Sequence, residues 1–212
     1  MWENFQAADE ALLRLINGQG ASSALDLTMA LISDFGLFKI PLLFAGIILG
    51  IFGKFRERML LVLVGLCVLI GDAGISRGLK EWVRRPRPMD VLEGIRIVKV
   101  DAVQWSQPDP SKTKGRSFPS SHTCNNVALA LVVTFLYGRR SAWIWLWPLL
   151  MSYSRVYTGS HYPSDVIVSW GLALAYTGGI LWICEKGWQR IGAKIFPQFY
   201  AQHPRLMVAP SL

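Results

Sequence analysis

Cysteines, charged residues and repeats are scarce in this chain of 212 residues. Its three cysteines are too few, and odd in number, for a disulfide-stabilised scaffold, and each lies in an apolar run. Only 17% of the residues are charged, whereas 52% are apolar, which excludes disorder over most of the chain. The sequence contains no internal repeat and no low-complexity tract. What is left is an apolar chain that can bury a large hydrophobic surface.

The charge balance is basic, with 22 Lys and Arg against 14 Asp and Glu and a formal net charge of +8. Such a charge is typical of nucleic-acid-binding proteins. The high apolar content instead favours a phospholipid bilayer as the partner and no nucleic acid, because membrane proteins collect Lys and Arg in their loops. The N-terminal residues show no basic run of a signal peptide, and neither end shows a lipidation motif. We therefore expect membrane insertion through internal apolar segments.

Five internal segments are apolar enough to cross a bilayer. A helix rises about 1.5 Å per residue, so a 17-residue segment covers roughly 25 Å of a core of about 30 Å, and flanking residues must contribute. The predicted spans cover residues 37–53, 59–79, 122–137, 142–158 and 164–184.

Two amphipathic segments precede the spans, at residues 4–17 and 23–35. Both carry too much charge to cross a bilayer, so we expect interfacial helices; the second could instead be a bent extension of the first span. The predicted fold is all-α: an integral membrane helical bundle of about five transmembrane helices plus N-terminal interfacial helices. Residues 1–196 form its single domain, and the proline-containing residues 197–212 form a loose C-terminal tail.

The basic residues predict the orientation of the bundle. The turns at 54–58 and 138–140 are rich in Lys and Arg, and with five spans they share the cytoplasmic side with the residues after the fifth span. Those last residues contribute Lys186, Arg190, Lys194 and Arg205. The loop 80–117 lies on the opposite side and yet holds nine Lys or Arg against five acids. An excess of positive charge on the outer side needs another reason, and anion binding supplies one.

Three polar motifs lie at the outer ends of the predicted spans, where the topology brings them to one membrane face. They are residues 80–88, with Lys80, Arg87 and Pro88, at the end of the second span; residues 117–122, from Ser117 to His122, at the start of the third; and Ser154-Arg155 at the end of the fourth, with His161 and Asp165 at the start of the fifth.

Two of these motifs place groups suited to phosphate chemistry at helix starts. Ser120 or Ser121 occupies an N-cap position, where free amides and the positive end of the helix dipole bind anions. Asp165 lies in the first turn of the last span, with His161 just before it. A carboxylate bonded to one ring nitrogen of His161 leaves the other nitrogen free to attack.

Three basic residues and a second histidine complete the set that metal-free phosphoryl transfer needs. Lys80, Arg87 and Arg155 supply positive charge for a phosphoryl group whose oxygens stay charged through the reaction. His122, on the opposite helix, is placed to protonate the departing oxygen.

The order and spacing of the motifs carry a family resemblance. The sequence resembles the type-2 phosphatidate phosphatase superfamily, also called lipid phosphate phosphatases, which is related to the vanadium haloperoxidases. The family pattern is K-x6-RP, PSGH and SR-x5-H-x3-D, and this chain matches it throughout except that Ser121 replaces the glycine. A serine backbone still donates its N–H group, so the exchange affects mainly how closely the substrate approaches.

The resemblance implies a role for each matching residue. His161 is the expected nucleophile, which forms a phosphohistidine; Asp165 orients it, and His122 is the general acid. No metal and no cofactor is implied. The expected phosphate-binding residues are Lys80, Arg87, Ser120, Ser121 and Arg155.

The membrane topology and the resemblance together suggest the substrate class and location. A phosphate on a membrane-anchored molecule can reach the site from the side of the bilayer, so we expect a lipid phosphate or diphosphate. Family frequency favours undecaprenyl diphosphate, with phosphatidylglycerol phosphate, phosphatidate and lipid A phosphate as alternatives. We expect a multi-pass protein of the cell (inner) membrane with its active site on the extracytoplasmic or periplasmic face.

Two other functions fit parts of the sequence. A lipid transporter or scramblase also carries polar residues in its spans, but near the middle of the bilayer and often in repeated halves, unlike this chain. A phosphotransferase would pass the same phosphohistidine to an acceptor other than water, and the sequence leaves that open. A soluble haloperoxidase does not fit the membrane-spanning pattern.

Some residues near the motifs keep two interpretations. We interpret Arg84 and Arg85 as interface anchors, with contact to lipid headgroups as the alternative. Asp72 either supports a basic residue of the site or pairs with Arg77. The segment 89–116 is either a lid or headgroup selector over the site or a disordered connector.

Overall fold

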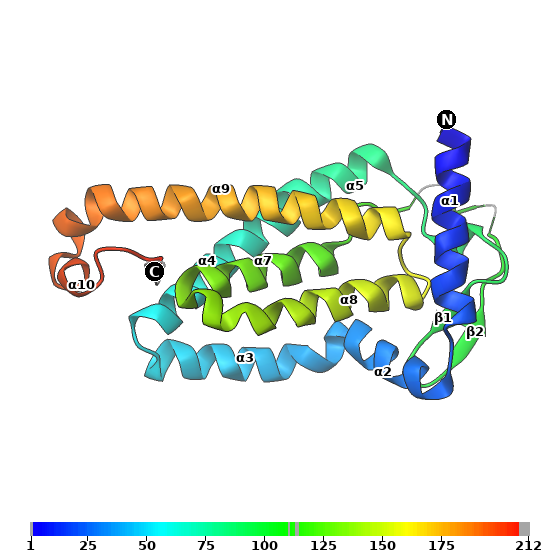
Figure 1. Ribbon diagram of the computed structural model, residues 1–212, viewed down its shortest axis with the longest axis horizontal. Helices are drawn as coiled ribbons and strands as arrows, with labels where there is room; N and C mark the ends of the chain where they lie inside the picture. The colour runs from blue at the N-terminus through cyan, green and yellow to red at the C-terminus, as the bar shows by residue number, and fades with distance from the viewer. Residues whose placement is uncertain (1, 110, 113–114, 208–212) are drawn as a thin grey trace.

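Five helices form the body of the protein. They are α3 (Phe35–Phe52), α4 (Phe55–Val68), α7 (Ser121–Tyr137), α8 (Leu146–Tyr157) and α9 (Pro163–Ile195). In Figure 1 the second of them, α4, is inclined to the long axis, along which the others run. The computed structural model describes residues 2–109, 111–112 and 115–207. Each of the five helices overlaps one predicted span, which confirms the all-α bundle. The bounds differ for two of them: α4 ends at Val68, within the predicted span 59–79, and α9 continues to Ile195, beyond the predicted 164–184.

Three helical segments of the described chain are long and apolar enough to cross a membrane: α3, the segment Phe55–Val91, and α9. The second of these comprises α4, a π-helical stretch at Leu69–Ser76, α5 (Arg77–Val83) and α6 (Pro88–Val91). The helices α7 and α8 are shorter, at 17 and 12 residues, and a 3₁₀ turn at Arg139–Trp145 joins them.

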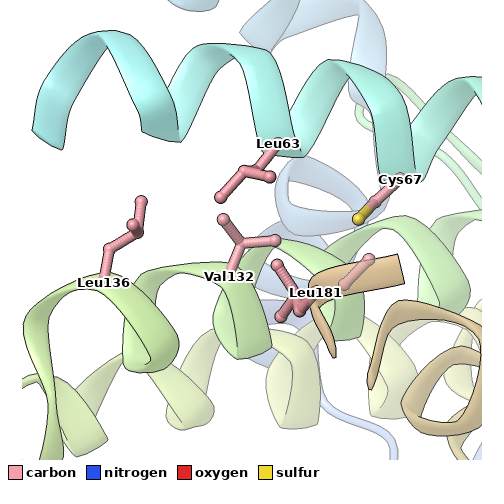
Figure 2. Packing of buried hydrophobic residues seen from close by; sticks show 6 residues of the cluster. Leu63, Cys67, Val132, Leu136 and Leu181 are labelled. Atoms are coloured by element: carbon pink, nitrogen blue, oxygen red, sulfur yellow. The ribbon is translucent and has the colours of Figure 1, made fainter. Parts of the chain in front are cut away.

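The helix α7 lies at the centre of the bundle, against α4, α8 and α9. Figure 2 shows Val132 and Leu136 of α7 packed against Leu63 and Cys67 of α4 and Leu181 of α9. In a bilayer such a cluster is stabilised by van der Waals packing between the helices, because the lipid tails have already removed these side chains from water. By contrast, α3 has no buried residue and presents an apolar outer surface, as expected of a helix that faces lipid.

The N-terminal helices lie at one end of the bundle. There α1 (Trp2–Arg14), which continues through a π-helical turn at Leu15–Gln19, crosses the bundle end (Figure 1). The next helix, α2 (Ser23–Ser33), begins at Ser22, whose hydroxyl accepts a hydrogen bond from a backbone amide of the first turn. Asp34 then adopts an extended conformation and caps α3, so α2 is a separate helix and not an extension of the first span.

The segment 89–116 contains an antiparallel hairpin of β1 (Arg96–Val98) and β2 (Val103–Trp105), which the sequence did not predict. The Asn17 side chain accepts from the Arg96 amide at 2.8 Å and donates to the Arg96 carbonyl at 2.9 Å. These bonds fix the hairpin to the end of α1, which excludes a disordered connector for the hairpin. Positions 110, 113 and 114 of this segment lie outside the described residues.

The C-terminal segment also differs from expectation, because the sequence predicts a loose tail at 197–212. In the structure α10 (Pro197–Gln202) turns the chain back, and Leu206 is buried. Glu185 of α9 accepts a hydrogen bond from the Leu206 amide at 2.9 Å. A buried carboxylate requires such donors, and the returning chain provides them. Residues 208–212 lie outside the described residues.

Candidate active site

Four helix ends meet where α1 and the hairpin cover the bundle: the C-terminal ends of α5 and α8 and the N-terminal ends of α7 and α9 (Figure 1). These ends, with the turns that follow them, carry every residue that the sequence predicts for the site. They are Lys80, Arg87, Ser120, Ser121, His122, Arg155, His161 and Asp165.

The histidines and basic residues of the three motifs lie within electrostatic range of one another. The charges of Arg155, Arg87 and Lys80 act on the His122 ring, and so does His161. The His161 ring likewise experiences Arg155 and Arg87. The structure therefore brings residues from three distant parts of the sequence together around one space.

The start of α7 forms the predicted anion-binding turn. Ser120 is the N-cap: its hydroxyl accepts from the amide three residues on at 3.4 Å, and its own amide donates to the Ser169 hydroxyl at 2.8 Å. Lys80 of α5 donates to the Ser121 hydroxyl. The amides of Ser121 and His122 have no carbonyl acceptor within the helix, which makes them available to an anion.

His161 and Asp165 face each other between α8 and α9. The distance from His161 Nδ1 to Asp165 Oδ2 is 3.8 Å, and both side chains are buried. Within the described chain Nδ1 has no hydrogen-bond partner, and a shift of about 1 Å would let it donate to Asp165. Burial lowers the pKa of His161 from 6.5 to about 4; Asp165 opposes this shift, and Arg155 adds to it. At pH 7 the ring is therefore neutral and has a free lone pair.

The loop that carries His161 is fixed by its backbone. Its amide and that of the preceding residue both donate to the Arg155 carbonyl, at 3.2 and 3.1 Å. Gly159 has a φ of +72°, and a Cβ there would lie 2.7 Å from Ile95 and 2.8 Å from the Arg96 carbonyl. Only glycine fits both requirements. The hairpin thus supports the histidine loop directly.

Asp165 is held by three donors in addition to facing His161. Its Oδ1 accepts from Arg85 at 2.6 Å, and its Oδ2 accepts from the Ser117 hydroxyl at 2.5 Å and the Tyr162 amide at 3.1 Å. The interpretation of Arg85 as an interface anchor is therefore wrong, because a carboxylate with 0% side-chain exposure needs a charged partner and Arg85 provides it. Arg85 and Ser117 both lie within the predicted clusters, but the sequence assigned neither of them a role at the site.

Residues at the junction between α2 and α3 contact two of the predicted site residues, Arg155 and His122. Arg155 is 7% exposed and donates to both the carbonyl, at 3.1 Å, and the hydroxyl of Ser33. Its Nε has no partner in the described part of the chain. The Phe35 ring lies edge-on to His122 with 6.1 Å between centroids. Serine and phenylalanine at a helix junction give no functional signal in the sequence, so both were missed.

Asp72 faces a groove of about 400 Å³ that Arg77, Lys80 and Arg116 also line. Its charge acts on Lys80. No ion pair joins Asp72 to Arg77 among the residues that the structure describes. Of the two interpretations, the structure favours support of Lys80.

The ligand that suits this arrangement is an anion. The charges of Arg155 and Arg87 act on the neutral, buried His161 ring, and Asp165 lies behind it. The second imidazole, His122, experiences the same two arginines and Lys80. No group of three or more His, Cys, Asp or Glu side chains that could hold a metal ion occurs among residues 2–109, 111–112 and 115–207. The geometry allows nucleophilic attack by His161 on a bound tetrahedral anion.

Comparisons with known proteins place these residues in a family context. The family model described as PAP2 superfamily matches residues 58–189, a range that contains all the predicted site residues. The crystal structure of Aquifex aeolicus LpxE is similar, with a TM-score of 0.60 and 26% identity, over 81% of this chain and 93% of that one.

Two curated proteins extend the comparison. Undecaprenyl-diphosphatase BcrC of Bacillus subtilis is 27% identical over 154 residues, which are 72% of this chain and 72% of that protein. Lipid A 4'-phosphatase of Bacteroides thetaiotaomicron is 39% identical over 69 residues, which are 32% of this chain. The match spans only 30% of the length of that second protein.

Proposed function

This chain belongs to the PAP2 superfamily, and we propose that it hydrolyses a lipid phosphate or diphosphate through a phosphohistidine on His161, without a metal ion. By family and by its apolar helices it is a phosphoric ester hydrolase of the membrane. The main support for the proposed chemistry is the buried His161–Asp165 pair, 3.8 Å apart, beside the charges of Arg155 and Arg87.

In the first step the lipid phosphate lies among Lys80, Arg87 and Arg155, which balance its charge. Because Nδ1 of His161 faces Asp165, Nε2 is the atom that attacks the phosphorus, in line with the leaving oxygen. The bond from phosphorus to that oxygen breaks, and His122, whose protonated form the adjacent phosphate anion stabilises, donates a proton to the oxygen. Asp165 stabilises the positive charge that develops on the His161 ring.

In the second step water hydrolyses the phosphohistidine. His122, now neutral, accepts a proton from the attacking water, so one residue acts first as an acid and then as a base. The bond from phosphorus to Nε2 breaks, inorganic phosphate leaves, and the His161 lone pair is restored.

We favour undecaprenyl diphosphate as the substrate, in line with the similarity to BcrC over 72% of each chain. Lipid A phosphate is the first alternative, because a lipid A 4'-phosphatase is also similar over 32% of this chain. Phosphatidylglycerol phosphate and phosphatidate are further alternatives. The basic turns at 54–58 and 138–140 support a site on the extracytoplasmic face of the inner membrane, since Lys and Arg are retained on the cytoplasmic side.

A substrate panel tests the function. Purified protein is given undecaprenyl diphosphate, lipid A phosphate, phosphatidylglycerol phosphate and phosphatidate in turn, with and without EDTA, and phosphate release is measured. We expect the highest kcat/KM with undecaprenyl diphosphate and no loss from EDTA. The H161Q protein, purified identically, measures any contaminating phosphatase. Release from none of the four lipids contradicts the function, and transfer of labelled phosphate to an added alcohol instead of water identifies a phosphotransferase.

The pH profile tests the state of His161. The neutral ring is the active form, and its pKa of about 4 places the loss of activity in acid well below the ordinary 6.5. We therefore expect kcat/KM, which reports the free enzyme, not to fall from pH 7 towards pH 5 after correction for the ionisation of the substrate phosphate. A corrected profile that falls to half near pH 6.5 contradicts a neutral, buried nucleophile.

A further inference from the structure

Arg85 lies between two carboxylates that come from opposite ends of the sequence. Its guanidinium donates to Asp165 Oδ1 at 2.6 Å through one nitrogen and to Asp9 Oδ2 at 2.7 Å through another. The same group lies over the Tyr162 ring, 3.9 Å from its centroid. With 22% of its side chain exposed, Arg85 is held on three sides and has little freedom to turn away from Asp165.

Asp9 belongs to α1 and is itself fixed at the start of α9. Its Oδ1 accepts from the Ser164 amide at 2.9 Å, and its Oδ2 accepts from the Ser164 hydroxyl. That hydroxyl also accepts from Arg85 at 2.8 Å. The Asp9 side chain is 4% exposed, so its charge depends on these donors rather than on water.

We propose that Asp9 is a positioning residue for the reaction, acting through Arg85 on Asp165. This inference rests on the proposed role of His161 as the nucleophile. Arg85 pairs with Asp9 as well as with Asp165, so its positive charge does not fully neutralise Asp165. Asp165 therefore keeps negative charge that can stabilise a positive charge on the His161 ring. The row Asp9–Arg85–Asp165 also holds the carboxylate at a fixed place opposite His161 Nδ1.

Loss of Asp9 should act on the chemical step. Arg85 would then pair with Asp165 alone and draw its charge away from the imidazolium that forms when His161 attacks phosphorus. Asp9 contacts neither the predicted phosphate-binding residues nor His122, so substrate binding should change little. We expect D9N to lower kcat by about 10- to 100-fold, the effect typical of losing a partner that orients a functional ligand.

The helix α1 has other attachments that keep D9N folded. Leu13 is fully buried in a cluster with Ile95 and Val166. Asn17 donates to the carbonyls of Arg96, at 2.9 Å, and Tyr157, at 2.7 Å. Removing one charge from Asp9 therefore leaves the helix docked.

The test compares D9N with D26N, a matched control. Asp26 lies on α2 and pairs with Arg96 at 2.6 Å, so its replacement breaks an ion pair of similar length that has no contact with Arg85 or Asp165. Tm, kcat and KM are measured for both variants and for D9E, which retains the charge. We expect a loss of kcat in D9N at unchanged KM, partial recovery in D9E, and nearly normal kcat in D26N.

Two outcomes overturn the role of Asp9: normal kcat in folded D9N, or equal losses of kcat in D9N and D26N that follow their losses in Tm. If D9N does not fold, the kcat of R85K is measured instead, because a lysine cannot bridge the carboxylates of Asp9 and Asp165. A normal kcat in R85K then overturns the proposal. Turnover that does not depend on His161 overturns the proposed function instead, so the two failures are distinguishable.

Discussion

Replacing His161 with glutamine is expected to lower phosphate release by about 10⁴-fold or more, the scale of loss when a covalent nucleophile is removed. Glutamine approximates the size of the imidazole but has no lone pair on nitrogen that can attack phosphorus. The loop should keep its shape, because its amides bond to the Arg155 carbonyl and not to the ring. The measurement is the initial rate of phosphate release by purified H161Q.

His203 provides the matched control for this change. It lies at the opposite end of the bundle, where its ring stacks on Phe55 with 4.4 Å between centroids. We expect H203Q to keep wild-type turnover. Turnover by folded H161Q within about tenfold of wild type contradicts the role of His161.

Replacing Asp165 with asparagine is the second large effect, and we expect a loss in kcat of about 10³- to 10⁴-fold. An amide cannot stabilise the imidazolium, and its NH₂ group would have to face a donor, because Arg85, Ser117 and the Tyr162 amide all donate to the carboxylate. KM should change much less than kcat, since Asp165 stands behind the histidine and away from the phosphate.

D90N is the control for D165N. Asp90 lies on the short helix α6, where its Oδ1 is 3.4 Å from Lys112 Nζ, and its replacement should leave kcat unchanged. A D165N protein with wild-type kcat, or one in which only KM rises, contradicts an orienting role for Asp165.

Local sequence patterns were enough to identify several of the predicted site residues. A serine after a proline at the start of an apolar helix indicates an N-cap, and Ser120 caps α7. His161 and Asp165 are four residues apart across a helix start, a spacing that sets them face to face. The alternation of spans then brings the motifs to one end of the bundle.

Their supporting partners could not be predicted, because these contacts join distant parts of the chain. Asp9 precedes its partner Arg85 by 76 positions, and Ser33 precedes Arg155 by 122. No local period or spacing encodes such a pair. A basic residue at a membrane interface is indistinguishable in the sequence from one that turns inward, as Arg85 does.

The hairpin and the C-terminal segment were missed for a related reason. Strands of three residues carry almost no alternation signal, and these strands depend on Asn17 and on the loop at Gly159. The sequence after α9 is typical of a loose tail. Its order in the structure depends on Glu185, whose carboxylate accepts hydrogen bonds from the amides of Leu206 and Met207. In both cases tertiary contacts supply the order that local propensity lacks.

The most direct test of the central claim is to find the covalent intermediate. Protein mixed with lipid that carries a radiolabelled terminal phosphate is quenched within one turnover in alkali, where phosphohistidine survives, then digested and sequenced by mass spectrometry. The account predicts label on His161, lost during a chase with unlabelled substrate and absent from H161Q. Full turnover with no labelled protein, or label on another residue, would contradict it.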